Sequence, residues 1–283
     1  MIAAIALDLG TTSIKAALMD HQGILRHIVT HPAPVIDSCD GRYESDALQY
    51  AAIAERVLKE CLAQTQNNPP LGLCSQRSSF LLWDKTTGEP VTPLISWQDD
   101  RGVSCCDRLQ ASSNTIHRLT GLRLTPYYLG PKLSVLLQEN PAWQEKLIQG
   151  EWLVGTLDTF LIWRWTGKQH FITDASMAAR TLLMDIHQQQ WSDVLCGLFD
   201  VPRSILPQIK PSTELGLTLD NGLMLQASVG DQSAALIASL ANNQSEALVN
   251  LGTGGFVIRS FAEKEAAFNG YLQTLVYQNR NRQ

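Results

Sequence analysis

Residues 2–19 read IAAIALDLGTTSIKAALM and give the clearest indication of the fold. It contains two apolar runs, Ile2–Leu7 and Ser13–Met19, on either side of a turn rich in glycine and threonine. Apolar runs of this length, separated by a short turn, predict a pair of antiparallel strands. A second turn at 20–23 leads to a third run, Ile24–Val29, so the N-terminus predicts an antiparallel meander.

A related pattern returns near the other end of the chain. DLGTT at 8–12 is echoed by NLGTGG at 250–255, and each stands between apolar runs. The backbone N–H groups and threonine hydroxyls of such a turn can hold phosphate oxygens. Asp8 could then hold a magnesium ion through its water shell, and Lys15 could offset phosphate charge.

The plainer interpretation is that Gly10 and Gly252 only permit tight turns. For either turn alone the two interpretations carry equal weight, because short turns with glycine are common. The pairing of the two turns favours phosphate binding. The chain has no GxxxxGK[ST] motif, so a nucleotide site here is not a P-loop.

Helical and extended patterns alternate along the rest of the chain. Apolar residues recur at helical spacing over 44–65 and over most of 102–150. The remaining expected elements are strands at Leu71–Ser75, Phe80–Trp83 and Gln226–Val229, short strands with polar turns over 151–185, and a helix at Ser233–Leu240. Strands interspersed with helices predict a mixed α/β domain.

The tetrapeptide GDQS at 230–233 stands where a predicted strand ends and a predicted helix begins. Asp231 can cap this helix by accepting hydrogen bonds from N–H groups of its first turn. It can also act as a general base toward a substrate hydroxyl, because phosphoryl transfer needs an oriented nucleophile and charge compensation. The sequence leaves both interpretations open.

Polar and aromatic residues follow two further strands. Gln76 and Arg77 come after the strand at 71–75, and Trp97 begins the run WQDDR at 97–101. Directed hydrogen-bonding groups beside an aromatic face suit a polyol, whose hydroxyls need partners and whose C–H face packs on rings. Taken singly, an arginine near a tryptophan is more often a surface ion pair beside a half-buried ring.

The composition of the chain limits which partners and metals it can bind. The chain has 283 residues and a net charge of −5, so it offers no basic surface for nucleic acid. Its six cysteines show no CxxC spacing, which argues for reduced thiols rather than disulfides or a zinc ribbon. His27 and His31 are expected to be solvated imidazoles and not a metal site.

The apolar run at the N-terminus is too short for a signal peptide and ends at Asp8. No stretch of the sequence reaches the length of a membrane span. A cytoplasmic protein without a membrane partner is therefore expected, and a homo-oligomer stays open.

Short motifs in a fixed order along the chain are similar to those of a known family. They are SQR at 75–77, WDKTTG at 83–88, WQD at 97–99, TGL at 120–122 with PY at 126–127, GTLDT at 155–159 with LIW at 161–163, TD at 173–174, ART at 179–181 and GDQ at 230–232. This order resembles the FGGY carbohydrate kinases, and within them the glycerol kinase pattern, over nearly the whole chain. The resemblance implies an α/β fold of the actin-like ATPase (ribonuclease H-like) type, with a mixed sheet flanked by helices.

The same resemblance implies roles for individual residues. Asp231 would be the catalytic base, and it would lie with Arg77, Trp97, Tyr127 and Gln232 around the polyol. A further set would lie at the phosphates of ATP and at Mg²⁺, with Asp8 as the metal residue: Asp8, Gly10, Thr11, Thr12, Lys15, Gly252 and Thr253.

The activity that the resemblance implies is ATP-dependent phosphorylation of a hydroxyl of a small polyol or sugar, of the glycerol or ketose kinase type. The alternative is a non-catalytic, actin-fold regulatory protein that binds nucleotide or sugar. Gln76, Arg77 and Trp97 favour the kinase, because a pure nucleotide switch does not need a polyol pocket.

This sequence departs from the family pattern in two ways, which change the expected acceptor and the expected activity. Ser78 stands where glycerol kinases carry an acidic residue, so a preference away from glycerol is expected. Family members are about twice as long, so residues 1–241 correspond to the sugar-binding lobe and 242–283 to the truncated start of a nucleotide-binding lobe. The chain alone is then expected to lack sustained activity. Its part 248–283, with a strand candidate at Leu272–Tyr277, is expected to be the least stable.

Overall fold

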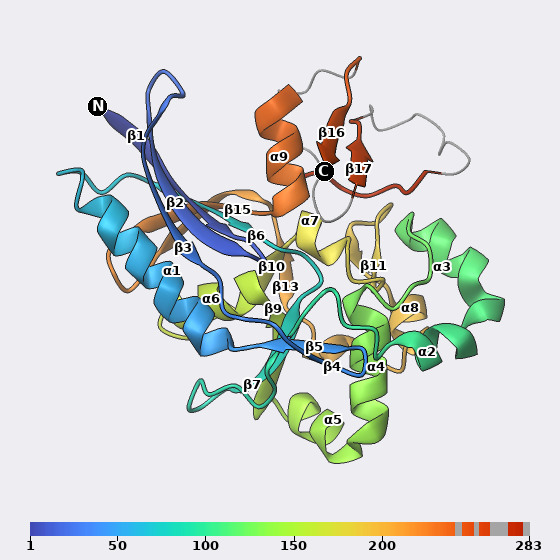
Figure 1. The fold of residues 1–283 in the computed structure, drawn as a ribbon. Coiled ribbons are helices and arrows are strands. Elements are labelled where there is room, and N and C mark those ends of the chain that lie inside the picture. Colours follow the sequence, from blue (N-terminus) through green and yellow to red (C-terminus); the bar gives the residue numbers. More distant parts are fainter. Residues whose placement is uncertain (241–244, 252–254, 261–270, 280–283) are drawn as a thin grey trace.

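The computed structural model describes residues 1–240, 245–251, 255–260 and 271–279, and Figure 1 shows how its strands and helices are arranged. The N-terminal meander is present as predicted. Its strands β1 (Ile2–Leu9), β2 (Ser13–Asp20) and β3 (Leu25–Pro32) pair antiparallel in this order. Leu9 faces Ile14 across the Gly/Thr turn.

The second predicted hairpin is also present. Its strands β16 (Leu248–Leu251) and β17 (Gly255–Ile258) pair antiparallel, and Leu251 faces Gly255 at the closed end. The turn residues Gly252 and Thr253 lie outside the described part of the chain.

The meander belongs to a larger sheet with the strand order β14-β15-β6-β1-β2-β3. The added strands are β6 (Leu71–Ser75), β14 (Thr213–Thr218) and β15 (Met224–Gly230). β1, β6 and β15 run parallel, and Ser75 pairs with Leu9 on one side and with Gly230 on the other. The carboxyl ends of these strands therefore meet at one edge of the sheet, where α/β proteins commonly bind ligands.

One face of this sheet carries the main core. In β1, Leu7 and Leu9 are fully buried while Ala6 is exposed, which is the two-residue period of a strand. Helix α1 (Ala47–Leu62) packs over β1, β2 and β3 (Figure 1), and α6 (Leu157–Trp165) shares the same core. Helix α9 (Asp231–Leu240) contacts β6 and β15.

A second sheet with its own helices lies beside the first. Its order is β4-β5-β8-β7-β9, from the strands β4 (Asp37–Cys39), β5 (Arg42–Ser45), β7 (Phe80–Asp84), β8 (Leu94–Ile95) and β9 (Trp152–Thr156). The helices expected over 102–150 are present as α2 (Val103–Arg108), α3 (Ser113–Thr120), α4 (Leu129–Glu139) and α5 (Pro141–Ile148). The remaining elements are β10 (Ile172–Asp174), α7 (Ala175–Ala178), β11 (Met184–Asp185), β12 (Gln190–Trp191), α8 (Asp193–Leu198) and β13 (Gln208–Lys210), with short 3₁₀ turns at Gln110–Ser112 and Arg203–Ile205. None of the helices within the described ranges is long and apolar enough to cross a bilayer.

Three details differ from the sequence-based expectation. Residues 151–185 contain α6, which was not predicted because its sequence LDTFLIWRW is apolar nearly all round and has no helical period. Leu272–Tyr277 is not a strand: Gln273 N–H donates to Gly121 O at 2.9 Å and Ser212 N–H donates to Gln278 O at 2.7 Å, so this segment lies on the N-terminal part of the chain.

The third difference concerns His31. Its Nε2 lies 2.9 Å from Glu60 Oε2, so this imidazole pairs with a carboxylate of α1 and is not only solvated. The pairing crosses from β3 to α1 and could not be seen from the spacing of His27 and His31. Glu60 also pairs with Arg56 Nε at 2.8 Å, and the pKa of Glu60 is lowered by His31 and then by Arg56.

One buried carboxyl predicts how stability depends on pH. Asp158 is fully buried, its Oδ1 has no hydrogen-bond partner, and burial raises its pKa from 3.8 to about 7. Between those two pKa values the folded chain holds a proton that the unfolded chain has lost, so stability falls as pH rises. Asp158→Asn should remove this fall, which has a limiting slope of about 1.4 kcal/mol per pH unit.

The measurement is the free energy of unfolding in urea at about pH 5 and about pH 8. Asp220→Asn, at an exposed aspartate, is the control and should keep the wild-type profile. Parallel profiles for wild type and Asp158→Asn would contradict the prediction.

Candidate active site

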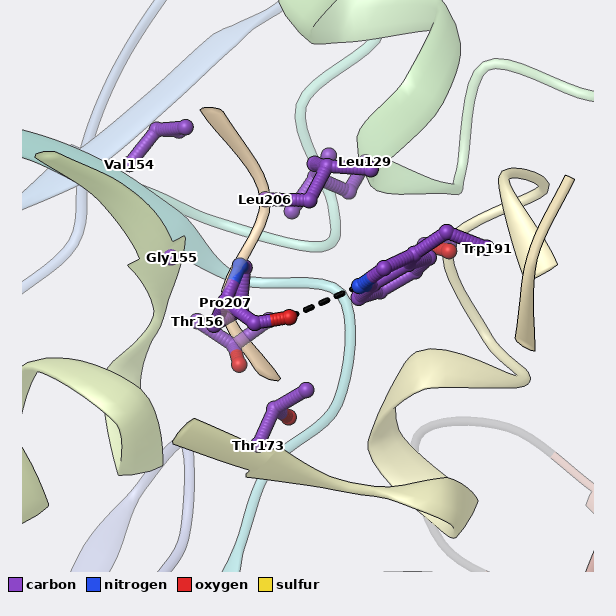
Figure 2. A pocket seen from close by; sticks show the side chains of 9 residues that line it. Leu129, Val154, Gly155, Thr156, Thr173, Trp191, Leu206 and Pro207 are labelled. Carbon is purple, nitrogen blue, oxygen red and sulfur yellow. Dashed lines mark hydrogen bonds between the residues drawn. The ribbon is translucent and has the colours of Figure 1, made fainter. Parts of the chain in front are cut away.

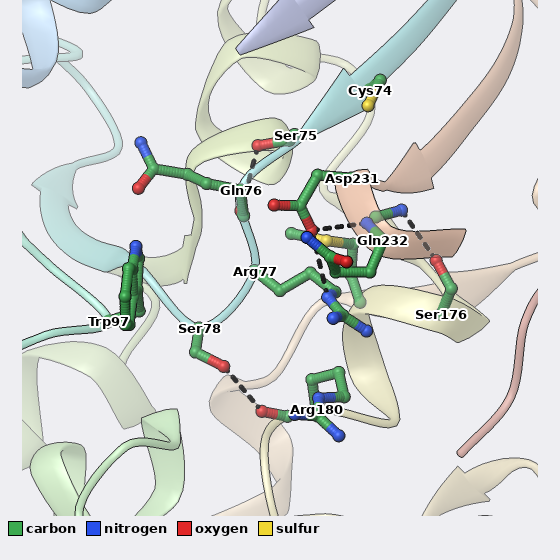
Figure 3. Close-up of polar contacts among 12 residues, drawn as sticks. Cys74, Ser75, Gln76, Arg77, Ser78, Trp97, Ser176, Arg180, Asp231 and Gln232 are labelled. Atoms are coloured by element: carbon green, nitrogen blue, oxygen red, sulfur yellow. Dashed lines mark hydrogen bonds and ion pairs between the residues drawn. The ribbon is translucent and has the colours of Figure 1, made fainter. Parts of the chain in front are cut away.

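The parallel strand ends bring together residues that are far apart in the sequence. Asp8 stands near the end of β1, Arg77 follows β6 after Gln76, and Asp231 follows β15 directly. Figure 3 shows Asp231 above the Arg77 side chain, with Trp97 to one side. The family resemblance implies that these residues belong to one site, and the register of β1, β6 and β15 brings the ends of their strands together.

Arg77 and Asp231 form the centre of the site. Arg77 Nε lies 3.2 Å from Asp231 Oδ1, and the side chains are 7% and 34% exposed, respectively. Burial lowers the pKa of Arg77, Arg180 lowers it further, and Asp231 raises it. Asp231 Oδ1 also accepts the N–H of Gln232 at 2.7 Å, so the carboxylate is held from two directions.

Gly230 makes this contact possible. A Cβ built on Gly230 would lie 2.5 Å from Arg77 Cδ and 2.8 Å from Cγ, closer than real side chains approach. The arginine stem therefore lies against the bare backbone of the strand end. This is a reason for glycine before Asp231 that the sequence pattern alone does not give.

Aromatic rings form a wall beside this pair. The Trp97 and Tyr127 rings are tilted with centroids 5.4 Å apart, and Tyr127 meets Tyr128 edge to face at 5.0 Å. We call these three residues the aromatic wall. The guanidinium of Arg180 lies 5.0 Å from the centroid of Tyr128, within the range of a cation–π contact. The sequence predicted Trp97 and Tyr127, but not Tyr128 or Arg180 as site residues.

A buried lysine holds the loop that presents Trp97. Lys132 is fully buried, and its Nζ donates to the main-chain oxygen of Ser96 at 2.7 Å. Burial lowers the pKa of Lys132 to about 7, against the raising effect of Asp99. Lys132 therefore supports the aromatic wall from behind.

A chain of hydrogen bonds connects the aromatic wall to the first hairpin turn. Trp97 Nε1 donates to Thr11 Oγ1 at 3.0 Å, and Thr11 Oγ1 donates to Gln76 Oε1 at 3.3 Å. Gln76 Nε2 donates to the Tyr50 hydroxyl at 3.0 Å, and that hydroxyl donates to Gly10 O at 3.3 Å. The predicted phosphate turn and the predicted polyol side are thus parts of one network. Tyr50 was missed because nothing in the helical pattern of α1 sets it apart.

Asp8 lies at the hairpin side of the site. It pairs across the strands with Lys15 and with Cys74, whose Sγ donates to Asp8 Oδ1 at 3.5 Å. Burial raises the pKa of Asp8; Cys74 and Lys15 lower it, and Asp231 raises it. Cys74 was missed, because its role depends on the register between β1 and β6.

The residues around Asp8 fit a magnesium ion better than a metal held by protein alone. Within the described ranges, no three histidine, cysteine, aspartate or glutamate side chains form a metal-binding cluster. The carboxylates of Asp8 and Asp231 are close enough for Asp231 to raise the pKa of Asp8. Magnesium commonly keeps several waters and uses one or two carboxylates together with substrate phosphates, which matches this donor set.

The structure shows fewer contacts with the site for the other predicted residues. Gly10 and Thr12 lie in the hairpin turn, where Gly10 N–H donates to Ser13 O at 3.1 Å, and the Thr12 and Lys15 side chains are exposed. Gln232 follows Asp231, and its Oε1 is buried without a hydrogen-bond partner. Gly252 and Thr253 cannot be placed, since they lie outside the described residues.

A small cavity next to the Tyr128 and Arg180 segments is too small to hold an acceptor. It has a volume of about 10 Å³ and is lined by Thr156, Thr173 and Trp191, among others (Figure 2). Trp191 Nε1 donates to Pro207 O at 2.7 Å across its wall. A cavity of this size holds about one water molecule.

Parallel strand ends that meet beside a Gly/Thr hairpin make this an actin-like α/β domain. Residues 3–249 match the N-terminal domain of the FGGY family of carbohydrate kinases, and the chain belongs to that family. The predicted family resemblance and fold class are confirmed.

Known relatives agree with this assignment. Glycerol kinase of Shewanella pealeana is 37% identical over 284 residues, which cover 96% of this chain and 57% of that protein. The crystal structure of Plasmodium falciparum glycerol kinase with ADP is similar with a TM-score of 0.91 and 27% identity, over 99% of this chain and 59% of that one. Xylulose kinase of Lactobacillus acidophilus shares the fold, with a TM-score of 0.78 and 21% identity over 89% of this chain and 53% of that one. The chain thus spans 57% and 59% of the lengths of the two glycerol kinases.

Proposed function

We propose that this chain binds the acceptor of an ATP-dependent kinase, which transfers the γ-phosphoryl group of ATP to a hydroxyl of a small polyol or sugar. The observation that carries the proposal is the position of Asp231. Its carboxylate stands at the strand-end edge of the sheet, 3.2 Å from Arg77 Nε and close enough to Asp8 to raise the pKa of that residue.

In the proposed reaction, Asp231 accepts the proton of the acceptor hydroxyl while the hydroxyl oxygen bonds to the γ-phosphorus. The bond from that phosphorus to the β,γ-bridging oxygen breaks, and ADP leaves with the electron pair. Arg77 orients the carboxylate of Asp231. Trp97 and Tyr127 offer ring faces to the C–H groups of the acceptor, and Gln232 Oε1 offers a hydrogen-bond acceptor to a further hydroxyl.

The first hairpin turn is proposed to face the phosphates of ATP. The residues assigned to that role are Asp8, Gly10, Thr11, Thr12 and Lys15, together with Gly252 and Thr253 of the second hairpin. Asp8 would hold Mg²⁺, which neutralises charge on the phosphate oxygens when it is bound. In the same proposal, residues 1–241 form the acceptor-binding lobe and 242–283 begin the nucleotide-binding lobe.

Ser78 argues against glycerol as the preferred acceptor. Its side chain is fully buried, and its hydroxyl donates to the main-chain oxygen of Arg180 at 3.0 Å (Figure 3). The hydroxyl is therefore committed to Arg180, and position 78 offers no carboxylate to the hydroxyls of an acceptor. Specific hydrogen bonds of that kind discriminate strongly between substrates.

The proposal is tested by acceptor binding to the 283-residue chain. The panel contains glycerol, erythritol, ketopentoses and the sugar acids of matching length, and calorimetry follows saturation. We expect saturable binding of at least one compound, lost in Trp97→Ala. Trp143→Ala is the matched control, because Trp143 packs on Trp152 with centroids 5.9 Å apart, in a ring pair that belongs to α5 and β9. Absence of saturable binding across the whole panel would contradict the proposal.

A further inference from the structure

Two buried arginines lie at the centre of the site, and one carboxylate is in direct contact with them. Arg77 is 7% exposed and Arg180 is 8% exposed, so both guanidinium groups belong to the interior. Asp231 pairs with Arg77, while no carboxylate of the described residues lies within ion-pair distance of Arg180. Two arginines therefore share one carboxylate in direct contact, and Arg180 has no counter-charge beside it among the described residues.

The two arginines are close enough to act on one another. After burial, Arg180 is the largest influence that lowers the pKa of Arg77, and it outweighs the raising effect of Asp231. Figure 3 shows the two side chains on the same side of the Arg77–Ser78 loop. Like charges in the interior are unfavourable unless a counter-charge is supplied.

Hydrogen-bond donors at this spot are also unsatisfied. The Nε atom of Arg180 is buried without a hydrogen-bond partner in the described structure, and the Nε atom of Arg77 has the 3.2 Å ion-pair contact with Asp231 Oδ1 but no well-formed hydrogen bond. The Arg180 guanidinium is held over the rings of Tyr127 and Tyr128, at 5.9 and 5.0 Å from their centroids. Aromatic rings fix its position but do not supply a negative charge. A buried donor without a partner costs about 1–3 kcal/mol.

The identity of residue 78 explains why Arg180 has no counter-charge from this position. Ser78 Oγ donates to the main-chain oxygen of Arg180, and its backbone has φ of 67°, in the left-handed region. A side chain at 78 therefore stands directly beside the Arg180 segment. Serine here brings no charge, so nothing from this position offsets the arginine pair.

We propose that the acceptor itself supplies the missing charge: it is a short polyhydroxy acid, whose carboxylate binds between Arg77 and Arg180 while one of its hydroxyls faces Asp231. This inference rests on the proposed kinase function and names its substrate class. A planar carboxylate matches the fork of a guanidinium group through paired N–H donors. The single negative charge of a carboxylate would give Arg180 its counter-charge, whereas a phosphate monoester would bring a charge of about −1.5 to −2.

The test compares acids with neutral polyols of the same carbon number in binding to the 283-residue chain. Glycerate is paired with glycerol and erythronate with erythritol, and glycerol 3-phosphate is a further arm. We expect the acid of each pair to bind at least about ten-fold more tightly than the polyol. This difference in affinity between acid and polyol should decrease as the salt concentration is raised, because the contact is ionic.

Arg180→Gln should weaken binding of the acid at least about ten-fold more than binding of the neutral polyol, which removes most of the preference for the acid. Arg56→Gln is the control, since Arg56 is 66% exposed on α1 and pairs with Glu60. Ser78→Glu should reverse the preference toward the neutral polyol, and Ser78→Ala should keep it. Melting temperatures check that each variant is folded, and Arg180→Gln carries the test if Ser78→Glu does not fold.

The outcomes separate this inference from the function on which it rests. Equal or tighter binding of the neutral polyols overturns the acid acceptor and leaves the kinase proposal standing. Tighter binding of glycerol 3-phosphate than of glycerate overturns the carboxylate assignment. Failure of every compound to bind overturns both proposals.

Discussion

Asp231→Asn is expected to lower kcat/KM for phosphoryl transfer by about 10²- to 10⁴-fold. The amide keeps the shape of the carboxylate but cannot take the proton of the acceptor hydroxyl. It also removes the negative charge 3.2 Å from Arg77 Nε, so acceptor binding must be measured beside turnover. The assay uses this chain extended by the C-terminal half of the Shewanella pealeana glycerol kinase, the relative with 37% identity, and follows ADP release.

Asp193→Asn is the matched control, because Asp193 is 78% exposed on α8 and pairs with Arg203. It should retain wild-type kcat/KM. If Asp231→Asn retained near wild-type turnover in a folded, acceptor-binding chain, the assignment of the base would be wrong. Comparable losses in Asp193→Asn would show that the assay reports folding and not chemistry.

Asp174→Ala is expected to lower the free energy of unfolding by more than about 3 kcal/mol. Asp174 is 2% exposed and accepts from the N–H groups of Ser176 and Met177 at 2.9 and 3.0 Å. It also accepts from the hydroxyls of Ser176 and Ser212, at 3.0 and 2.6 Å. The alanine variant would leave these donors buried and unpaired.

The same change should also affect Asp231, the proposed base. The N–H of Gly230, directly before Asp231, donates to Ser176 Oγ at 2.8 Å. Loss of Asp174 frees the Ser176 hydroxyl, so acceptor affinity should fall together with stability.

Urea unfolding with a fluorescence readout measures the effect of Asp174→Ala. Asp46→Ala is the control: Asp46 caps α1 through the N–H groups of Leu48 and Gln49 but is exposed, so its removal should cost about 1 kcal/mol. An Asp174→Ala chain as stable as Asp46→Ala would mean that the buried network is unimportant.

Most of the fold follows from local patterns. The meander, the strand at 71–75 and the helices over 102–150 have the period or turn that their structure requires, and they are found where the sequence predicts them. The exception α6 is buried on nearly all sides, so its sequence has no polar face to reveal a period. Leu272–Tyr277 has a strand-like sequence, but its hydrogen bonds go to Gly121 and Ser212 instead of to a neighbouring strand.

The site was predictable where residues follow a strand end or belong to a family motif. Asp231 follows β15 directly and Arg77 follows β6 after Gln76, and both belong to motifs of the family pattern, so the sequence could bring them together. Arg180 could not be predicted to join them, because its place depends on a hydrogen bond from Ser78, 102 residues away along the chain. Cys74 depends in the same way on the register of β6 against β1.

The parallel alignment of β1, β6 and β15 has an evolutionary consequence. Inward-facing residues of these strands, such as Leu7, Leu73 and Leu225, are buried and constrained by packing, while the proposed acceptor site lies just beyond the strand ends. On the proposed function, replacement of single residues at 78 or 232 would change the preferred acceptor without altering the sheet. Substrate range should diverge faster than architecture among descendants of such a domain.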